Sequence, residues 1–482
     1  MRVSQRPFPV VKVKGAKAMA FEVPPDLMVS VSGVRGRVGE GLTPEVITRF
    51  AAAFGAWIRD QTGLGARVVV ARDSRTSGPM FVNAATAALQ SVGCDVISLG
   101  LVPTPTALLA VRRHQAAGAL VVTASHNPVE WNALKFASGE GMFLDADQSA
   151  AMRAYVADRD ILRAGWDQLG TVTEDGTALH AHLQAILAVP FLDIPALRNR
   201  RFRVALDCCH GAGSVLLPAL FERLGCEVEG LHLEPDGRFH RPPEPVAENL
   251  GELEDLVRRS RADIGMATDP DADRLSLVGN GGRALGEDLT LALAARLVLR
   301  HRPGTIVTNL STSRLLEDIA AEAGVPLHRA PVGEIHVARA MQAAGAVVGG
   351  EGNGGVILPD VQLTRDSAVA AALVLQLLLE LDTPVDEVVR ALPGYTIVKD
   401  RLPRDAGDLE EAYDRLEGEL GAPESDRQDG LRLSWPESRR WLHLRASGTE
   451  PILRIIAEAP TEAGARELVA AAREALLTGV RS

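Results

Sequence analysis

Short apolar segments rich in β-branched residues alternate with longer amphipathic segments along most of the chain. These apolar segments form three groups, at 68–71, 96–99 and 119–122, then at 204–206 and 264–267, then at 305–307 and 346–348. Short strands that alternate with helical patterns are typical of βαβ units. This threefold repeat therefore predicts three similar α/β domains with mixed, mostly parallel sheets.

Each unit places its most unusual polar residues directly after its last apolar segment. These loops span residues 123–128, 268–274 and 349–355. In parallel sheets, ligands bind beyond the carboxyl ends of the strands. We therefore expect three domains to present three loops to one central cleft.

The chain after about residue 396 follows a different pattern. Helical patterns at 408–420 and 463–477 enclose strand patterns at 430–434, 441–444 and 452–457. This order predicts a smaller C-terminal α+β domain. We expect an N-terminal extension at 1–27, α/β domains at 28–165, 166–280 and 281–395, and the α+β domain at 396–482.

Length, composition and charge exclude several classes of protein function. The 482 residues exceed the roughly 250–300 that one core supports, and the apolar fraction of 46% is ordinary for a globular protein. A net charge of −11 argues against nucleic-acid binding. The longest apolar stretch, 367–379, is shorter than the ~18–20 residues of a membrane span and predicts a buried helix. Four cysteines without a C-x-x-C pair favour a cytoplasmic protein with no disulfide framework.

The loop after the second group carries three alternating aspartates, Asp269, Asp271 and Asp273. Carboxylates this close repel one another unless a cation lies between them. Oxygen ligands at this density suit Mg²⁺ or Ca²⁺. A solvated acidic turn is the alternative, but three carboxylates beside a buried strand end favour metal binding.

Three further loops carry residues suited to binding or catalysis. Ser125 and His126 stand in Thr-Ala-Ser-His-Asn-Pro, where helix capping is the alternative interpretation. Glu351, in a glycine-rich loop, is a candidate for binding sugar hydroxyls, and a flexible turn is the alternative. Residues 445–451 offer a guanidinium, hydroxyls and backbone amides, which suit a phosphate dianion as well as a surface turn.

Together and in this order, the four loops resemble those of the α-D-phosphohexomutase superfamily, which contains phosphoglucomutase, phosphomannomutase and phosphoglucosamine mutase. The resemblance extends from about residue 28 to the C-terminus. It implies that Ser125 is the phosphoserine and that it shares one Mg²⁺ with the three aspartates. It also implies roles in binding the substrate for Arg274, Glu351, Asn353, Arg445, Ser447, Gly448 and Thr449.

Smaller matches agree with this resemblance, and some departures concern the substrate. Arg35 stands in a motif similar to the family's Gly–Ile–Arg–Gly, and Lys135 matches the lysine that follows the serine loop. Ala133 stands where glycine is usual, and the sugar loop lacks the bacterial Ser-Gly-His ending. This loop is more similar to the archaeal-type branch, whose members are often assigned to phosphoglucosamine or phosphomannose substrates.

The resemblance implies a complete reaction. Ser125 would donate its phosphoryl group to a hexose monophosphate, and the resulting hexose 1,6-bisphosphate, also the activator, would turn over and return its other phosphate. The expected catalytic residues are Ser125, His126, Lys135 and Arg35. The sequence does not decide whether His126, Lys135 or Arg35 is the general base. We expect glucosamine phosphate as the substrate, with mixed phosphomannomutase/phosphoglucomutase specificity as the alternative.

Two other function classes use the same residues. A metal-dependent sugar phosphatase would release phosphate and would not need the loop at 445–451. A non-catalytic sugar-phosphate sensor would be expected to lack the serine or an aspartate, and none is missing. We expect a sugar phosphate as the partner, no nucleic acid or membrane, and a monomer or homodimer.

Overall fold

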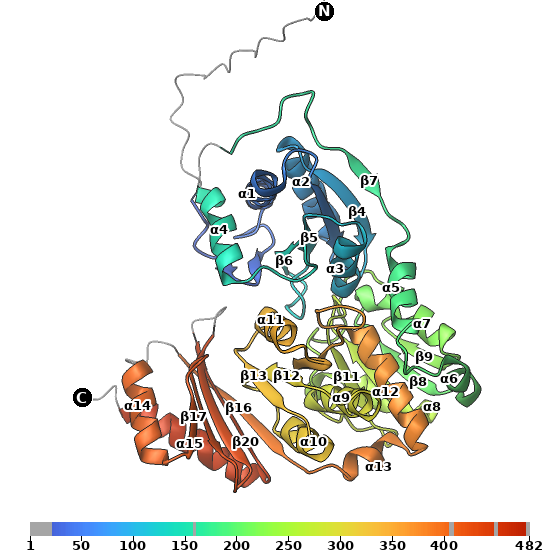
Figure 1. Ribbon diagram of the computed structural model, residues 1–482, viewed down its shortest axis with the longest axis vertical. Helices are drawn as coiled ribbons and strands as arrows, with labels where there is room; N and C mark the ends of the chain where they lie inside the picture. The colour runs from blue at the N-terminus through green and yellow to red at the C-terminus, as the bar shows by residue number, and fades with distance from the viewer. Residues whose placement is uncertain (1–21, 158–160, 404–408, 448–451, 479–482) are drawn as a thin grey trace, which may run out of the picture.

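The structure is a computed structural model that describes residues 22–157, 161–403, 409–447 and 452–478. It has four sheets, with domain I at the top of Figure 1, domains II and III below it, and domain IV at the lower left. The expected N-terminal extension lies mostly outside the described residues. No helix within the described ranges is long and apolar enough to cross a membrane.

Domain I is built on a seven-stranded sheet in the order β1-β2-β6-β5-β3-β4-β7. The strands β3, β4, β5 and β7 pair in parallel, whereas β6 runs antiparallel to β5. Its elements are β1 (Met28–Ser30), β2 (Gly33–Arg37), α1 (Pro44–Thr62), β3 (Arg67–Arg72), α2 (Gly78–Ser91), β4 (Asp95–Leu101), α3 (Thr104–Arg113), β5 (Gly118–Val122), β6 (Trp131–Ser138), α4 (Ala146–Ala157) and β7 (Val172–Glu174). The strand β7 lies beyond the boundary expected at residue 165 and extends the first sheet.

Domain II has a four-stranded sheet in the order β11-β10-β8-β9. Its elements are α5 (Ala178–Leu187), α6 (Ile194–Arg200), β8 (Arg203–Asp207), the 3₁₀ helix η1 (Ala212–Val215), α7 (Leu217–Arg223), β9 (Glu227–Leu231), the 3₁₀ helix η2 (Ala247–Asn249), α8 (Gly251–Ser260), β10 (Ile264–Thr268) and β11 (Leu275–Val278). The strand β11 is antiparallel to β10, and the other pairs are parallel.

Domain III repeats this sheet in the order β13-β12-β14-β15. Its elements are α9 (Asp288–His301), β12 (Ile306–Asn309), α10 (Leu315–Ala323), β13 (Leu327–Ala330), α11 (Glu334–Ala344), β14 (Val348–Glu351), β15 (Gly355–Ile357), α12 (Ser367–Leu381) and α13 (Val385–Arg390). The predicted buried helix is α12, which begins where the Asp366 carboxylate accepts hydrogen bonds from the N–H groups of Ala368 and Val369. It packs against α9 in a hydrophobic core that domains II and III share.

Domain IV has an antiparallel five-stranded sheet in the order β16-β20-β19-β18-β17, with its own core. Its elements are β16 (Thr396–Pro403), α14 (Leu409–Leu420), β17 (Glu424–Asp426), β18 (Leu431–Trp435), β19 (Arg440–Ala446), β20 (Ile452–Ala459) and α15 (Glu462–Thr478). The predicted α+β tail is confirmed. The sequence pattern missed β16 and β17 because both are edge strands with mostly exposed or half-buried side chains.

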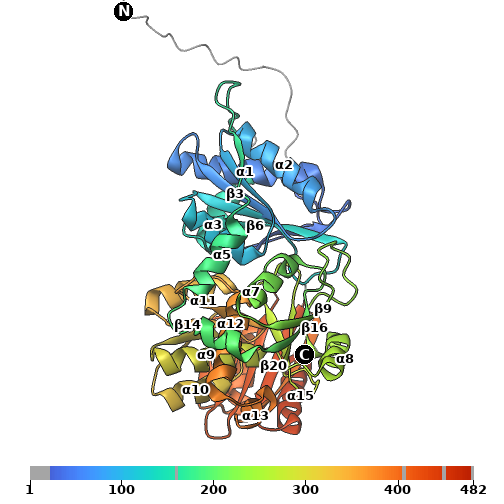
Figure 2. The same cartoon turned by 90° about the vertical axis from the view of Figure 1, so that its right-hand side faces the viewer.

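The threefold repeat is visible in the strand orders. Domains I, II and III share the local order β4-β3-β5-β6, β9-β8-β10-β11 and β13-β12-β14-β15. In each, the polar loop picked out in the sequence joins the last parallel strand to an antiparallel return strand. Figure 2 shows domain I stacked on domains II and III.

Candidate active site

Ser125 follows β5 on a backbone that the fold holds in an unusual conformation. Its φ is 48°, a left-handed value that glycine adopts freely and that serine adopts only at a cost in energy. The Ser125 N–H donates to the Thr123 hydroxyl at 3.0 Å, and the side chain is almost completely buried. The bond holds the Ser125 backbone in place, and the burial limits the directions in which its hydroxyl can point.

The buried side chain of Arg75 holds this loop in place. Its guanidinium forms an ion pair with Asp73 at 3.1 Å, and neither side chain is exposed. It also donates to four carbonyl oxygens of the serine loop and its flank, those of Ser125 (2.7 Å), Asn127 (2.6 Å), Pro128 (2.7 Å) and Trp131 (2.9 Å). The planar, five-donor guanidinium suits this task, because one group orients several carbonyls at once.

The three aspartates follow β10, and their side chains are completely buried. One oxygen of each lies within 4.8 Å of one from each of the others. Oδ1 of Asp271 and Oδ1 of Asp273 are buried without a hydrogen-bond partner. Buried carboxylate oxygens that lack a donor fit a hard cation such as Mg²⁺.

The serine loop of domain I and the aspartate loop of domain II meet directly. The Ser125 hydroxyl donates to Oδ2 of Asp269 at 2.9 Å, across 144 positions of sequence. The Lys135 ammonium donates to Oδ2 of Asp271 at 2.8 Å, and the Thr104 hydroxyl donates to the same oxygen at 2.8 Å. The fold therefore brings Ser125, Lys135 and the three aspartates into one cluster.

Burial and charge shift the pKa values of this cluster in different directions. Burial, together with repulsion by Asp273 and Asp271, raises the pKa of Asp269 well above its usual value. Burial acts in the same direction on Asp271, but the Lys135 ammonium holds its pKa well below the usual range. Burial opposes the charge of Lys135, yet Asp271 and Asp273 raise its pKa, so Lys135 remains an ammonium.

His126, Arg35 and Arg274 surround the serine loop. Nδ1 of His126 lies 3.4 Å from the Ser125 hydroxyl, and Arg35 donates to the side-chain oxygen of Asn127. Burial, then the charges of Arg274 and Arg35, lower the pKa of His126 well below its usual value, which favours the neutral imidazole. The Arg274 N–H donates to Oδ1 of Asp269 at 3.3 Å.

Glu351, at the end of β14, lies in a network that reaches the aspartate loop. Its Oε1 accepts from the Asn309 amide at 2.8 Å and from the Gly333 N–H at 3.0 Å. Its Oε2 accepts from Arg365 at 2.7 Å and from Asn353 at 3.4 Å. Arg365 also pairs with Asp273, so one buried guanidinium joins the sugar loop to the aspartate loop. Glu351 can bind a sugar hydroxyl only if it gives up one of these bonds.

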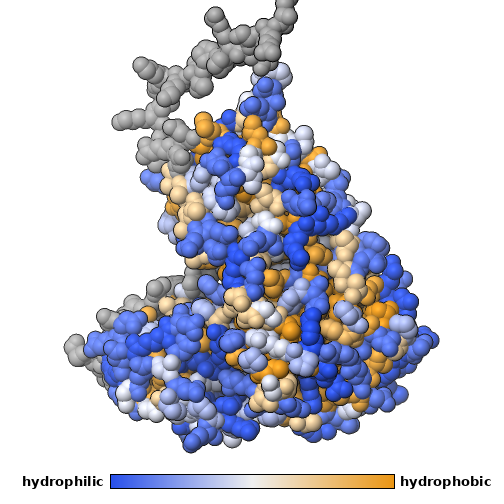
Figure 3. Space-filling model, in the orientation of Figure 1, coloured by the Kyte–Doolittle hydropathy of each residue, from blue (hydrophilic) through white to orange (hydrophobic). Residues whose placement is uncertain are grey.

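The loop at 445–451 belongs to domain IV. Arg445, at the end of β19, pairs with Asp429 at 2.9 Å, and Ser447 is buried with its N–H bonded to the Ile452 carbonyl at 2.9 Å. Gly448 and Thr449 lie outside the described residues. Figure 3 shows the molecular face hollowed between domain I and domain IV. The structure thus places Arg445 and Ser447 on a different domain from the cluster around Ser125.

Comparison with known proteins places this arrangement in a family. The phosphoglucomutase/phosphomannomutase alpha/beta/alpha domains I, II and III match residues 27–161, 180–282 and 286–395, and the C-terminal domain matches 398–475. The chain belongs to the phosphoglucomutase/phosphomannomutase family. The enzyme is therefore a phosphohexomutase, an isomerase of the phosphotransferase type.

Relatives and solved structures cover almost the whole enzyme. It is 36% identical over 450 residues to a "Probable phosphoglucosamine mutase" of Methanopyrus kandleri, which covers 91% of this chain and 95% of the relative. It is 38% identical over 440 residues to a "Phosphoglucomutase/phosphomannomutase" of Thermococcus kodakarensis, covering 90% and 95%. A phosphoglucomutase/phosphomannomutase family protein of Burkholderia thailandensis has a TM-score of 0.81 at 28% identity, covering 94% of this chain and 99% of that one.

Sequence reasoning missed two buried arginines that contact the candidate site, Arg75 and Arg365. Arg75 stands in the polar loop after β3, so its position beyond a strand end was a signal that could have identified it. Arg365 carries no such signal, because it precedes the buried helix α12 without any motif around it. Its importance comes from the buried carboxylates of Asp273, Glu334 and Glu351, with which it pairs.

Proposed function

We propose that this enzyme interconverts hexose 6-phosphate and hexose 1-phosphate by way of a phosphoserine at Ser125 and a 1,6-bisphosphate intermediate. The observation that carries this proposal is the hydrogen bond between Ser125 and Asp269 inside a buried cluster of three aspartates. A buried hydroxyl beside a cation site is suited to accept and return a phosphoryl group.

Each residue of the cluster has a different role in the proposed reaction. Asp269, Asp271 and Asp273 would hold Mg²⁺, which when bound would neutralise charge on the phosphoryl oxygens. The Ser125 hydroxyl is the nucleophile, and Arg75 keeps its loop in the shape that aims it. The Lys135 ammonium, 2.8 Å from Asp271, supplies positive charge beside the transferring group. His126 and Arg35 complete the set of candidates for proton transfer and charge stabilisation.

We assign the rest of the ligand to residues of domains II, III and IV. Arg445, Ser447, Gly448 and Thr449 would hold the phosphate that is not reacting, while Glu351, Asn353 and Arg274 contact the sugar. Arginine is suited to this role because its guanidinium binds phosphate through two hydrogen bonds. A bisphosphate that turns over between two such sites presents each phosphate to Ser125 in turn.

We propose glucosamine phosphate as the preferred substrate. The relatives support this choice, since several archaeal members bear the name "Probable phosphoglucosamine mutase" at 33–36% identity. The 38% identical relative is named for glucose and mannose phosphates, which makes mixed phosphomannomutase/phosphoglucomutase specificity the second candidate.

The first test replaces the nucleophile. We expect Ser125→Ala to lose at least about 10³-fold in kcat with a trace of bisphosphate activator, because no group remains to carry the phosphoryl. Ser438→Ala, at an exposed position of the hairpin between β18 and β19, is the matched control and should keep full activity. Full mutase activity in Ser125→Ala would overturn the phosphoserine scheme.

The second test compares substrates. Glucosamine, mannose and glucose phosphates are assayed side by side with Mg²⁺, and kcat/KM should be highest for glucosamine phosphate. Comparable values for glucose and mannose phosphates would favour the mixed specificity. Steady phosphate release without interconversion would support the phosphatase class.

Chelation with EDTA should abolish turnover, and added Mg²⁺ should restore it.

A further inference from the structure

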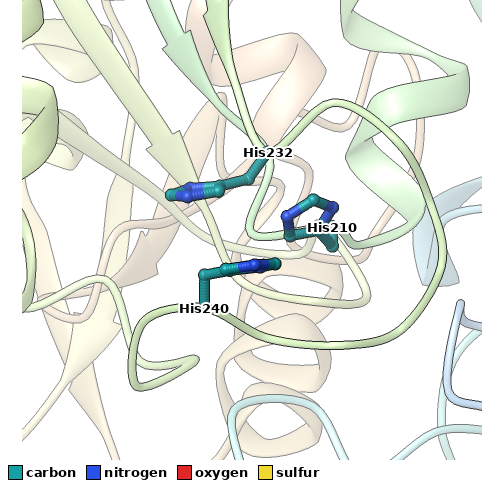
Figure 4. Close-up of side chains that lie close together, drawn as sticks. All are labelled: His210, His232 and His240. Atoms are coloured by element: carbon teal, nitrogen blue, oxygen red, sulfur yellow. The ribbon is translucent and has the colours of Figure 1, made fainter.

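Three histidines of domain II lie together outside the site described above. His210 follows β8, His232 directly follows β9, and His240 lies in the loop between β9 and η2. Their ring centroids are 4.6–5.4 Å apart. Figure 4 shows the rings of His232 and His240 facing each other, with His210 beside them. The phosphohexomutase reaction proposed above uses none of the three.

The hydrogen bonds of these rings fix which nitrogen carries the proton. Nδ1 of His210 lies 2.7 Å from the Glu234 carbonyl oxygen, and Nδ1 of His240 lies 3.1 Å from the Arg238 carbonyl oxygen. A carbonyl can only accept, so both Nδ1 atoms must donate. Nδ1 of His232 lies 3.1 Å from Oδ1 of Asp207, a carboxylate that also pairs with Arg241. In each neutral ring, the lone pair is therefore left on Nε2.

This pattern is the one that metal-binding histidines use. A metal-ligating imidazole donates its other N–H to a carbonyl or carboxylate, which fixes its tautomer and orientation. The pair of His232 and Asp207 reproduces the carboxylate–histidine arrangement, and the other two rings use main-chain carbonyls. The backbone supports the cluster as well, because the His210 N–H donates to the His232 carbonyl at 2.8 Å.

The distances are compatible with one ion after the rings reorient. One ring nitrogen of each histidine, either Nδ1 or Nε2, lies within 4.8 Å of one from each of the others. Zn–N bonds of about 2.0–2.1 Å place tetrahedral ligands about 3.4 Å apart, so the rings must close by roughly 1 Å. The planes of His232 and His240 are only 12° apart, so one of these rings must also turn before both lone pairs reach the ion. His240 is exposed and can make this adjustment. Oε2 of Glu252 lies 3.6 Å from Nε2 of His232 and is placed to supply a fourth ligand.

We propose that His210, His232 and His240 form a second metal site, which binds a first-row transition-metal ion of the Zn²⁺ class. Imidazole nitrogens suit Zn²⁺, Ni²⁺ and Cu²⁺, whereas Mg²⁺ prefers oxygen ligands. The site is thus chemically distinct from the aspartate cluster. It does not depend on the function proposed above.

The position of the site gives the ion a structural role. The loop that carries His240 also carries Phe239, whose ring lies under the guanidinium of Arg75 at 4.9 Å. Arg241, the residue after His240, pairs with Asp207. It also donates to the carbonyl of Thr268 at 2.8 Å, and Thr268 directly precedes the aspartate loop. An ion bound by the three histidines would tie this loop to the ends of β8 and β9, next to the residues that shape both catalytic loops.

Co²⁺ titration of the full-length protein tests the proposal. Excess Mg²⁺ is present throughout, to occupy the aspartate cluster. Tetrahedral Co²⁺ with nitrogen ligands absorbs visible light strongly, whereas Co²⁺ with six oxygen ligands absorbs weakly. We expect a strong band that saturates at one equivalent and disappears on addition of Zn²⁺. Weak absorption alone, or a strong band that disappears when the Mg²⁺ concentration is raised further, would overturn the proposal.

Histidine variants test whether these three histidines are the Co²⁺ ligands that give rise to the visible band. His240→Asn and His210→Asn should lose it and weaken Co²⁺ binding by more than the roughly 10–100-fold that loss of an outer partner costs. Asparagine tolerates the left-handed backbone of His210, whose φ is 52°. His180→Asn, at an exposed position of α5, is the matched control and should keep the band. A band that persists in both cluster variants would contradict the site.

Zn²⁺ should also raise the thermal unfolding temperature of the wild type, because it binds only the folded cluster, and leave that of His240→Asn unchanged. This readout is independent of mutase activity. An equal rise in both proteins would place the bound Zn²⁺ elsewhere and count against the proposal.

Discussion

Single buried arginines decide the shape of the catalytic loops. Arg75 orients four carbonyl oxygens around the serine loop while Asp73 balances its charge. Arg241 has a similar relation to Asp207 in domain II, where it holds the Thr268 carbonyl before the aspartate loop. Asp73 directly follows β3, and Asp207 is the last residue of β8. In both domains this carboxylate pairs with an arginine that contacts the loop after β5 or the end of β10.

Arg75→Lys should therefore damage activity without removing the charge. Lysine has at most three donors on one nitrogen and cannot reach four carbonyls in the plane of a guanidinium. We expect a loss of about 2–4 kcal/mol in the free energy of unfolding and a fall of at least about tenfold in kcat. Arg112→Lys, on the exposed face of α3, is the control. Denaturant unfolding and mutase kinetics give both readouts, and wild-type values for Arg75→Lys would contradict this role.

At the scale of the elements, the same connection recurs in three domains. Each catalytic loop lies between the last parallel strand and an antiparallel return strand, and each contains a backbone with positive φ. Ser125 has a φ of 48°, Ala272 of 54° and Gly354 of 86°. A Cβ at Gly354 would lie 2.5 Å from the Leu275 carbonyl oxygen, so glycine is required there. The sharp return after each strand aims the loop residues at the region between domains.

Helix α9 begins at the partly buried carboxylate of Asp288, which should make stability depend on pH. Burial raises the pKa of Asp288 from its usual value near 3.8 to about 7, and its carboxylate accepts from the Ser313 N–H at 2.8 Å. The folded state therefore binds this proton more tightly than the unfolded state. Stability is lost as pH rises from about 4 to about 7, by at most about 4 kcal/mol.

Asp288→Asn should remove this dependence while it keeps an oxygen to accept from Ser313. We expect the variant to be more stable than the wild type at about pH 8 and nearly equal to it at about pH 4. Thermal unfolding of both proteins across this range measures the difference. A constant difference between the two proteins at every pH would contradict a raised pKa at Asp288.

At the scale of the whole molecule, the four domains are joined unequally. Domains II and III share one hydrophobic core, whereas domain IV has its own. Polar contacts hold domain IV to domain III, among them the bond from the Arg314 N–H to Glu458 at 2.9 Å and the contact of Ser311 with His443 at 2.8 Å. A polar interface of this kind permits domain movement more readily than a shared apolar core.

A sugar 1,6-bisphosphate should draw domain IV toward domain I. In the proposed reaction, one phosphate reaches Ser125 of domain I and the other reaches Arg445 of domain IV, and Figure 3 shows a hollow between these two domains. We expect small-angle scattering to show a smaller radius of gyration when the ligand saturates the enzyme. Arg445→Ala, which lacks the second anchor, should bind more weakly and remain in the open shape. Unchanged scattering of the wild type at saturation would show that the enzyme accepts the ligand without closing.

The sequence by itself determined the repeated strands, the polar loop at the end of each and the residues of the serine and aspartate motifs. These features are local, because hydrophobic period and loop chemistry are set by neighbours within a few positions. Only the tertiary structure decided that Ser125 meets Asp269, that Arg75 and Arg365 bind the loops, and that His210, His232 and His240 gather. Those contacts join residues up to 144 positions apart, and which distant groups meet depends on how the sheets pack.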